Sequence, residues 1–346
     1  MRFSDVLDIR NGRNQRQVEN ENGKYPIYGS GGVMGHADDF ICDAETVVIG
    51  RKGSINNPIF VDEPFWNVDT AFGLVAHKEV LLPKYLYYFC VNFDFERLNT
   101  TVTIPSLTKA NLLQIEIRVP DMDIQQNIVS VLDKICYLIE LRQKELYNLD
   151  QLVKSRFIEM FGVYPANPMG WEIGTIRDIV TEVRYGSSRP AVDGGKYPYL
   201  RMNNITYGGE LDLSDTKRID IPDNELDKCT VRRGDVLFNR TNSKELVGKT
   251  CVYDRDEMMV LAGFVIRIRV KDCILPEFLS AFLNTDFSKQ MLLGMCKTAI
   301  GQANINAQEL QNIGLYLPPV ELQRRFIQFK KETDKSKSFD DLEVAA

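Results

Sequence analysis

The sequence predicts an α+β protein in which two related units, each mixing strands and helices, are joined by one long helix. Three observations predict this class. Landmarks recur in the same order in both halves of the 346 residues, most segments of each half are short and β-branched, and a long run without proline or glycine lies between the halves. The length accommodates two units of about 150 residues each.

Five landmarks are shared by the two halves. They are Asp5-Val6-Leu7 and Asp178-Ile179-Val180, Tyr25-Pro26 and Tyr197-Pro198, Arg51 and Arg240, Pro83 and Pro276, and Pro120 and Pro318. The separation between matched positions is 173 and 172 residues at the first two landmarks and then grows through 189 and 193 to 198, as insertions in the second copy would require. We therefore predict two homologous units, residues 1–160 and 171–346, joined by the Pro- and Gly-rich stretch 162–170.

Within each unit, apolar and β-branched runs broken by Gly, Asn or Asp predict strands. These runs are Thr46–Gly50, Phe60–Val61, Phe72–Ala76, Val236–Phe238, Val260–Val265 and Ile266–Val270. Pro83 and Pro276 each open a short apolar segment, which predicts a helix with proline in its first turn.

A long helix is predicted from Asp123 to Phe161, where proline and glycine are absent. Apolar residues recur at alternating spacings of four and three, at Ile128, Leu132, Ile135, Ile139, Leu146, Leu149, Val153 and Met160, and Arg142 and Arg156 interrupt the stripe. A second stripe, Leu322, Phe326 and Phe329, predicts a shorter helix after Pro319. The two helices form either a two-helix spacer or separate amphipathic surface helices of their own domains.

Composition excludes several classes of protein. A net charge of −6, 44% hydrophobic residues and no run of 18 apolar residues argue against a disordered chain and a membrane-spanning one. The N-terminus lacks an apolar signal-peptide core, and the seven cysteines form no C-x-x-C pair, so we expect reduced, mostly buried thiols in a cytoplasmic protein. Because the net charge is negative, any positive charge that binds DNA must be concentrated in particular parts of the chain.

Catalytic motifs are poorly matched. The Gly29–Gly35 stretch fails the G-x-G-x-x-G spacing because position 34 is Met, and is expected to be a turn. Gly248-Lys249-Thr250 lacks the glycine that a phosphate-binding loop requires. Two histidines and no zinc or EF-hand spacing leave no metal site to propose. A recognition or scaffold protein is favoured.

Matched polar loops are the candidate recognition sites. Arg51, Lys52 and Ser54 follow a strand in the first unit, and Arg240, Thr241, Asn242 and Lys244 stand at the matched place in the second. Arginine and lysine contact phosphates, and arginine also pairs with guanine. Further candidates are Arg201 and Asn203, at the position of Gly29–Gly32, and Lys297, at the position of Thr100–Thr103.

Three stretches together carry a resemblance to a known family. Tyr25–Gly32, Thr46–Ser54, and Pro120 followed by Gln125-Gln126 and the long helix resemble the DNA-specificity subunits of type I restriction–modification systems. The resemblance covers nearly the whole chain.

The resemblance implies two mixed α/β target recognition domains, residues 1–120 and 171–317, each reading one half of a split, asymmetric DNA site. It implies that a central helix, 121–161, pairs antiparallel with a C-terminal helix, 319–338. It implies a non-catalytic subunit that docks two methyltransferase subunits and the restriction (motor–nuclease) subunits. S-adenosylmethionine, ATP and Mg are expected on those partners, and no cofactor on this chain.

Two other functions remain open from the residues alone. One is a single-chain DNA methyltransferase or nuclease with a cryptic site, which binding of S-adenosylmethionine to the isolated chain would favour. The other is a coiled-coil protein-interaction scaffold, which failure to bind DNA with or without a methyltransferase partner would favour.

Overall fold

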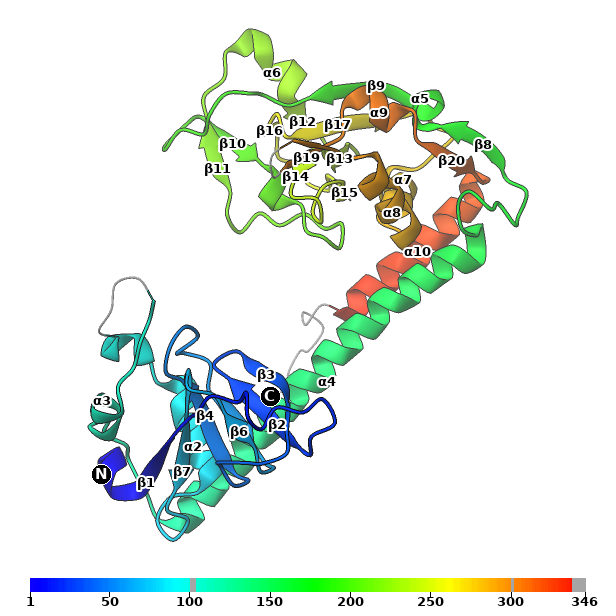
Figure 1. Ribbon diagram of the computed structural model, residues 1–346. Coiled ribbons are helices and arrows are strands. Elements are labelled where there is room, and N and C mark those ends of the chain that lie inside the picture. Colours follow the sequence, from blue (N-terminus) through cyan, green and yellow to red (C-terminus); the bar gives the residue numbers. More distant parts are fainter. Residues whose placement is uncertain (100–103, 300–301, 338–346) are drawn as a thin grey trace, which may run out of the picture. The chain divides into compact units, whose positions relative to one another are not determined.

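The computed structural model describes residues 1–99, 104–299 and 302–337. The chain divides into two compact units, residues 1–143 (unit 1) and 144–346 (unit 2), which are drawn in Figure 1. One helix, α4 (Met122–Phe161), contributes to both units. The expected mixture of strands and helices in each unit is confirmed.

Unit 1 contains two sheets. The larger, β1-β7-β4-β5, is antiparallel throughout, and the smaller, β3-β2-β6, pairs β2 with β6 in parallel. Its elements before α4 are α1 (Phe3–Val6), β1 (Leu7–Asn11), β2 (Tyr25–Gly29), β3 (Gly32–Ala37), β4 (Thr46–Gly50), β5 (Ile59–Val61), β6 (Trp66–Asn67), β7 (Ala71–Ala76), α2 (Pro83–Asn92), η1 (Phe95–Leu98) and α3 (Lys109–Leu113). The main core packs α1, α2 and α3 against the larger sheet.

Unit 2 repeats this plan with additions. Its sheets are β9-β17-β13-β15, β11-β10-β16-β12, β14-β19-β18 and β8-β20. Its elements are β8 (Glu172–Thr175), α5 (Ile176–Ile179), β9 (Val180–Tyr185), β10 (Tyr197–Leu200), η2 (Met202–Asn204), β11 (Lys217–Ile219), α6 (Asp223–Cys229), β12 (Thr230–Val231), β13 (Val236–Asn239), β14 (Thr241–Asn242), β15 (Thr250–Val252), β16 (Met259–Leu261), β17 (Val265–Val270), α7 (Pro276–Leu283), α8 (Asp286–Met295), β18 (Lys297–Ala299), β19 (Gln302–Asn304), α9 (Ala307–Gln311), β20 (Gly314–Leu317) and α10 (Val320–Lys337).

The predicted duplication is confirmed by the sheet topology. The orders β1-β7-β4-β5 and β9-β17-β13-β15 are the same, and every neighbouring pair in both sheets is antiparallel. Both β1 and β9 follow a four-residue helix whose third residue, Asp5 or Asp178, accepts a hydrogen bond from the backbone N–H that precedes the helix. Two matched landmarks thus form the same local structure.

A glycine ends the same strand in both units because another backbone passes close by. A β-carbon added to Gly12 would lie 1.8 Å from the carbonyl oxygen of Val68, and one added to Gly186 would lie 2.2 Å from that of Leu261. Neither contact is possible for a larger residue. The shared glycine is therefore a steric requirement of the crossing strands.

One predicted strand boundary is wrong. The sequence places strands at Val260–Val265 and Ile266–Val270, whereas β16 ends at Leu261 and β17 begins at Val265. The chain turns between them, where Val265 N–H donates to Ala262. Gly263 alone interrupts this apolar run, so a periodicity argument misses the turn.

The predicted long helix and its antiparallel partner are confirmed within unit 2. Phe326 of α10 lies 5.2 Å from Phe157 and 5.7 Å from Phe161, ring centre to ring centre, while Lys337 binds Asp150 at 2.6 Å. Phe326, in the first half of α10, thus contacts the end of α4, and Lys337, at the end of α10, contacts Asp150 further back along α4. The two helices are therefore antiparallel, as Figure 1 shows. With 18 residues, α10 is about half as long as the 40-residue α4.

The predicted apolar stripe is only partly buried. Phe157, which the heptad pattern omits, is 2% exposed, whereas Ile128, Ile135 and Ile139 are 37%, 46% and 52% exposed. The described part of α10 reaches only to Asp150 of α4. Periodicity identifies an apolar face, but burial depends on how far the partner helix extends.

A buried glutamine joins each spacer helix to its own domain. Gln125 accepts a hydrogen bond from Leu82 N–H at 2.9 Å and donates to Val80 and Pro120. Gln323 makes the same contacts, accepting from Leu275 N–H at 2.8 Å and donating to Cys273 and Pro318. Because Leu82 and Leu275 cap the helices α2 and α7, the two matched landmarks form identical joints.

All seven cysteines are unpaired. Cys42, Cys90 and Cys251 are buried, but Cys136 and Cys273 are exposed, so the thiols are less buried than predicted. Apolar neighbours in the sequence do not fix burial.

Candidate nucleic-acid interface

Arg51 and Arg240 occupy equivalent places in the two units. Gly50 pairs with Ala71 at the end of β4, and Asn239 pairs with Val265 at the end of β13, so the arginine is the next residue in each copy. The backbone around the arginines is also the same. Arg51 N–H donates to Thr70 and its carbonyl accepts from Leu107, while Arg240 N–H donates to Phe264 and its carbonyl accepts from Ile305.

The unit 1 loop presents its polar groups to solvent. Arg51, Lys52 and Ser54 are all exposed. The Arg51 guanidinium donates to the carbonyl of Asp69 at 3.3 Å and lies 5.8 Å from the Phe72 ring centre. Neither contact neutralises its charge, so a cation and hydrogen-bond donors remain available to an anionic ligand.

Two further segments meet this loop. β-carbons added to Gly50 and Gly53 would lie 3.1 Å and 3.6 Å from side-chain atoms of Ser30, so the 29–32 turn is adjacent. Gly53 N–H donates to Pro105 at 3.1 Å on the other side. The turn expected over Gly29–Gly35 is confirmed only at its start, where Ser30 and Gly31 connect β2 to β3; Gly32–Gly35 belong to strand β3. Thr100–Thr103 lie outside the described residues.

Arg240 is held more firmly than Arg51. Its guanidinium donates to Asn304 Oδ1 at 3.1 Å and stacks 4.7 Å from the Tyr185 ring centre. The side chain is half-buried, and its Nε has no partner in the described structure. A guanidinium fixed in this way is preorganised for a planar hydrogen-bonding partner.

The other unit 2 loop candidates differ in exposure. Thr241 is 6% exposed, which places its hydroxyl inside the protein. Asn242 is half-buried, and its Oδ1 accepts a hydrogen bond from Ser243 N–H at 2.9 Å. The NH2 group of the same side chain can then donate to a ligand. Lys244 is exposed. Asn242 and Lys244 are therefore accessible, while Thr241 supports the loop from within.

Arg201 and Asn203 flank the start of η2. Arg201 forms an ion pair with Asp215 at 2.8 Å and also donates to the Asp215 carbonyl. Its charge is therefore largely neutralised, whereas Asn203 is exposed. The sequence could not reveal this ion pair, because Asp215 lies in a connection between β10 and β11 that is longer than the tight β2–β3 turn of unit 1.

Lys297 begins β18, which pairs with β19 so that Lys297 lies opposite Asn304. The backbone of this candidate is thereby placed beside the residue that binds Arg240. Its side chain lies outside the description.

Sequence reasoning missed two lysines packed against the unit 2 loops, buried Lys249 and half-buried Lys289. Lys249 is 7% exposed and donates to the carbonyl of Met202 at 3.0 Å, and Lys289 donates to that of Gly248 at 2.8 Å. Burial lowers the pKa of both ammonium groups, and that of Lys289 falls to about 8. Nothing in a single sequence distinguishes a buried lysine from a solvated one.

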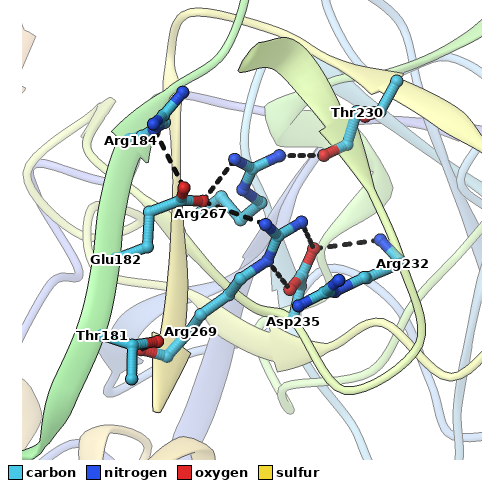
Figure 2. Close-up of polar contacts among 8 residues, drawn as sticks. All are labelled: Thr181, Glu182, Arg184, Thr230, Arg232, Asp235, Arg267 and Arg269. Atoms are coloured by element: carbon cyan, nitrogen blue, oxygen red, sulfur yellow. Dashed lines mark hydrogen bonds and ion pairs between the residues drawn. The ribbon is translucent and has the colours of Figure 1, made fainter. Parts of the chain in front are cut away.

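A charged network lies within the main sheet of unit 2 (Figure 2). Glu182 of β9 binds Arg267 and Arg184, and also contacts Arg269 at 3.2 Å, which in turn binds Asp235 at 2.8 Å. Arg267 is 1% exposed. The equivalent position in unit 1 is occupied by Gly73, so this network distinguishes the two copies.

Acid is expected to destabilise unit 2 through Glu182. Burial acts to raise the pKa of this carboxyl, but the hydrogen bond from Arg267 and the charges of Arg267, Arg269 and Arg184 outweigh it and lower the pKa. The ionised Glu182 carboxylate contributes fully to the free energy of unfolding above its unfolded-state pKa of about 4.3. This contribution is lost as the pH falls through the folded-state pKa.

Replacing Glu182 by Gln tests this expectation. The change should cost roughly 2–3 kcal/mol of unfolding free energy at pH 7, because it leaves Arg267 buried without its counter-charge. It should also flatten the loss of stability below about pH 4. Urea unfolding at several pH values measures both, and an acid-induced loss as steep as that of the wild type would contradict the assignment to Glu182.

No group of three or more His, Cys, Asp and Glu side chains in the described part of the chain is arranged to hold a metal ion. No helix in the described ranges has the length and apolarity needed to cross a membrane.

Comparison with known proteins identifies relatives. The family model described as the type I restriction modification DNA specificity domain matches residues 1–151 and 168–337. The specificity subunit of the type I restriction enzyme EcoKI from Escherichia coli is 23% identical over 299 residues, which are 80% of this chain and 64% of that protein. The MjaIX specificity subunit of Methanocaldococcus jannaschii is 27% identical over 190 residues, 48% of this chain and 42% of that protein.

Solved structures show the same fold. The type I restriction–modification S subunit from M. genitalium matches with a TM-score of 0.57 and 16% identity, covering 97% of this chain and 89% of its own. A chain from a type I restriction–modification complex matches with a TM-score of 0.56 and 17% identity, covering 97% and 90%. The two matched blocks coincide with the two copies found in the topology. The chain therefore belongs to the type I restriction–modification DNA specificity family.

Proposed function

We propose that this chain is the DNA-recognition subunit of a type I restriction–modification complex and reads a split, asymmetric site. The observation that carries the proposal is the equivalence of Arg51 and Arg240 on two copies of one fold. The side chains that follow them differ, Lys52 in one copy and Thr241 in the other. Two copies that share one backbone structure but carry different polar side chains can contact two half-sites of different sequence.

The available groups fit double-stranded DNA. Exposed Arg51 and Lys52 can pair with phosphates, and a fixed guanidinium such as that of Arg240 can pair with guanine. The Asn242 and Asn203 amides are suited to adenine edges. These contacts would be local in a chain whose net charge is −6.

We further propose that chemistry resides on partner subunits. The spacer of α4 and α10 would dock two methyltransferase subunits, and the complex would include restriction subunits that act as motor and nuclease. S-adenosylmethionine, ATP and Mg would bind those partners in the cytoplasm. Family membership supports this arrangement, as does the complex assembly described for a structural relative.

A genome-wide map of methylated adenines tests the function. Cells that carry the gene are expected to show methylation at a split motif, and the motif should vanish when only this gene is deleted. Restoring the gene should restore the motif. Persistence of every methylated motif after deletion, with the partner genes intact and expressed, would exclude the proposal.

Arg51→Ala and Arg240→Ala test whether the units read separate halves. Each should relax or change bases in one half of the motif only, because each arginine belongs to one unit. A lost arginine–guanine pair should reduce methylation at wild-type sites about tenfold. Arg118→Ala removes an exposed arginine outside the loops and is the control. Changes in both halves from either variant would contradict separate reading.

A further inference from the structure

Lys249 and Lys289 connect three segments of unit 2 around one turn. Gly248 N–H donates to the carbonyl of Asn239, and Asn239 N–H donates to that of Lys249, so the turn is fixed at the end of β13. Lys249, in this turn, donates a hydrogen bond to the Met202 carbonyl, and Lys289 of α8 donates one to the Gly248 carbonyl. Both lysines thus bind backbone carbonyls rather than carboxylates.

The tethered segments carry the candidate recognition residues. Met202 begins η2, which includes Asn203 and directly follows Arg201. The 243–249 turn continues from Arg240–Asn242. The hydrogen bond of Lys249 therefore connects the segment of Arg201 and Asn203 to the segment that follows Asn242. Lys289 binds the same turn from helix α8.

The charges around Lys289 are mostly positive. Lys249 faces it from the turn and Lys154 from α4, and both lower its pKa in addition to burial. Lys154 is paired with Asp286 on α8 at 2.8 Å, and the Tyr207 ring lies 5.5 Å from the Lys289 ammonium. Two neighbouring ammonium groups, one buried and one half-buried, repel one another and destabilise the free protein, and a polyanion nearby would relieve this repulsion.

The described part of unit 1 has no lysine at the position of Lys249. Counting along the paired strands β4–β5 and β13–β15 places Asn57 at the position of Lys249, and Asn57 is exposed. Lys249 therefore has no lysine counterpart in unit 1, and removal of either lysine should affect only what unit 2 does.

We propose that Lys249 and Lys289 are positioning residues that hold the 201–204 and 240–249 segments in the geometry that reads one half of the DNA site. This rests on the proposed function. The lysines also place two positive charges beneath the recognition surface, so DNA bound there stabilises their protonated forms.

Lys249→Met and Lys289→Met test the positioning role by mapping methylated adenines in cells. Each variant should lower methylation at wild-type sites about tenfold and relax bases in the unit 2 half, while the unit 1 half is retained. Lys228→Met, at an exposed lysine of α6, is the matched control and should leave the motif unchanged. An unaltered motif in both variants, at wild-type protein abundance, would overturn the proposal. Absence of any motif with the wild-type chain would instead reject the proposed function.

Proton uptake on binding DNA provides a second test, made first on the wild-type complex. The purified wild-type complex is titrated by calorimetry with a duplex bearing its methylation motif, in two buffers of different ionisation enthalpy. At pH 8 Lys289 is about half protonated, so binding should take up as much as about half a proton, and much less at pH 6.5. Lys289→Met, where it folds, should abolish the uptake. Binding at pH 8 without proton uptake would overturn the proposal.

Discussion

Phe157→Ala is expected to lower the free energy of unfolding of unit 2 by about 3–5 kcal/mol. Phe157 is 2% exposed, and its ring centre lies 5.5 Å from that of Phe278 and 5.2 Å from that of Phe326. It therefore joins α4, α7 and α10 at one point. Truncation removes these contacts and leaves a cavity that three helices must collapse to fill.

Urea unfolding of the purified chain measures the effect, with Ile135→Ala as the matched control on the same helix. Ile135 is 46% exposed, so its truncation should change the unfolding free energy by no more than about 0.5 kcal/mol. Equal effects of the two substitutions would show that the α4–α10 packing described for Phe157 does not govern stability.

Gln125→Leu and Gln323→Leu should each cost about 3 kcal/mol, in unit 1 and unit 2 respectively. Each glutamine is fully buried and makes three hydrogen bonds to backbone groups. Leucine has a similar size but leaves one N–H and two carbonyls without partners, and each buried orphan costs about 1–3 kcal/mol before relaxation.

Hydrogen exchange resolved by peptide distinguishes the units in these variants. Gln125→Leu should raise exchange at the start of α2 and leave α7 protected, and Gln323→Leu should do the reverse. Gln126→Leu, at the exposed neighbouring position, is the control and should be nearly neutral. Protection of α2 unchanged by Gln125→Leu would contradict the joint.

Much of the fold could be predicted because its signals are local. The growing separation between matched landmarks revealed the duplication, and the absence of proline and glycine between Asp123 and Phe161 revealed α4. Pro83 and Pro276 were correctly placed in the first turns of α2 and α7. The break before Val265 was missed because no turn residue other than Gly263 marks it.

The candidate site was predictable only as a set of polar loops. The equivalence of Arg51 and Arg240 follows from matched strands, which the sequence shows. The pairing of Arg201 with Asp215, the stacking of Arg240 on Tyr185 and the partial burial of Lys289 do not follow from the sequence. The role of these loops in binding DNA stays a prediction for the experiments above.

The duplication and the long helix between the copies can be read from the sequence, because spacing and helix-breaking residues act on neighbours along the chain. Three properties emerge only on folding: which face of α4 is covered, which arginine keeps its charge available, and which lysines are removed from water. Those properties depend on groups distant in sequence, whose packing sets solvent access and local charge.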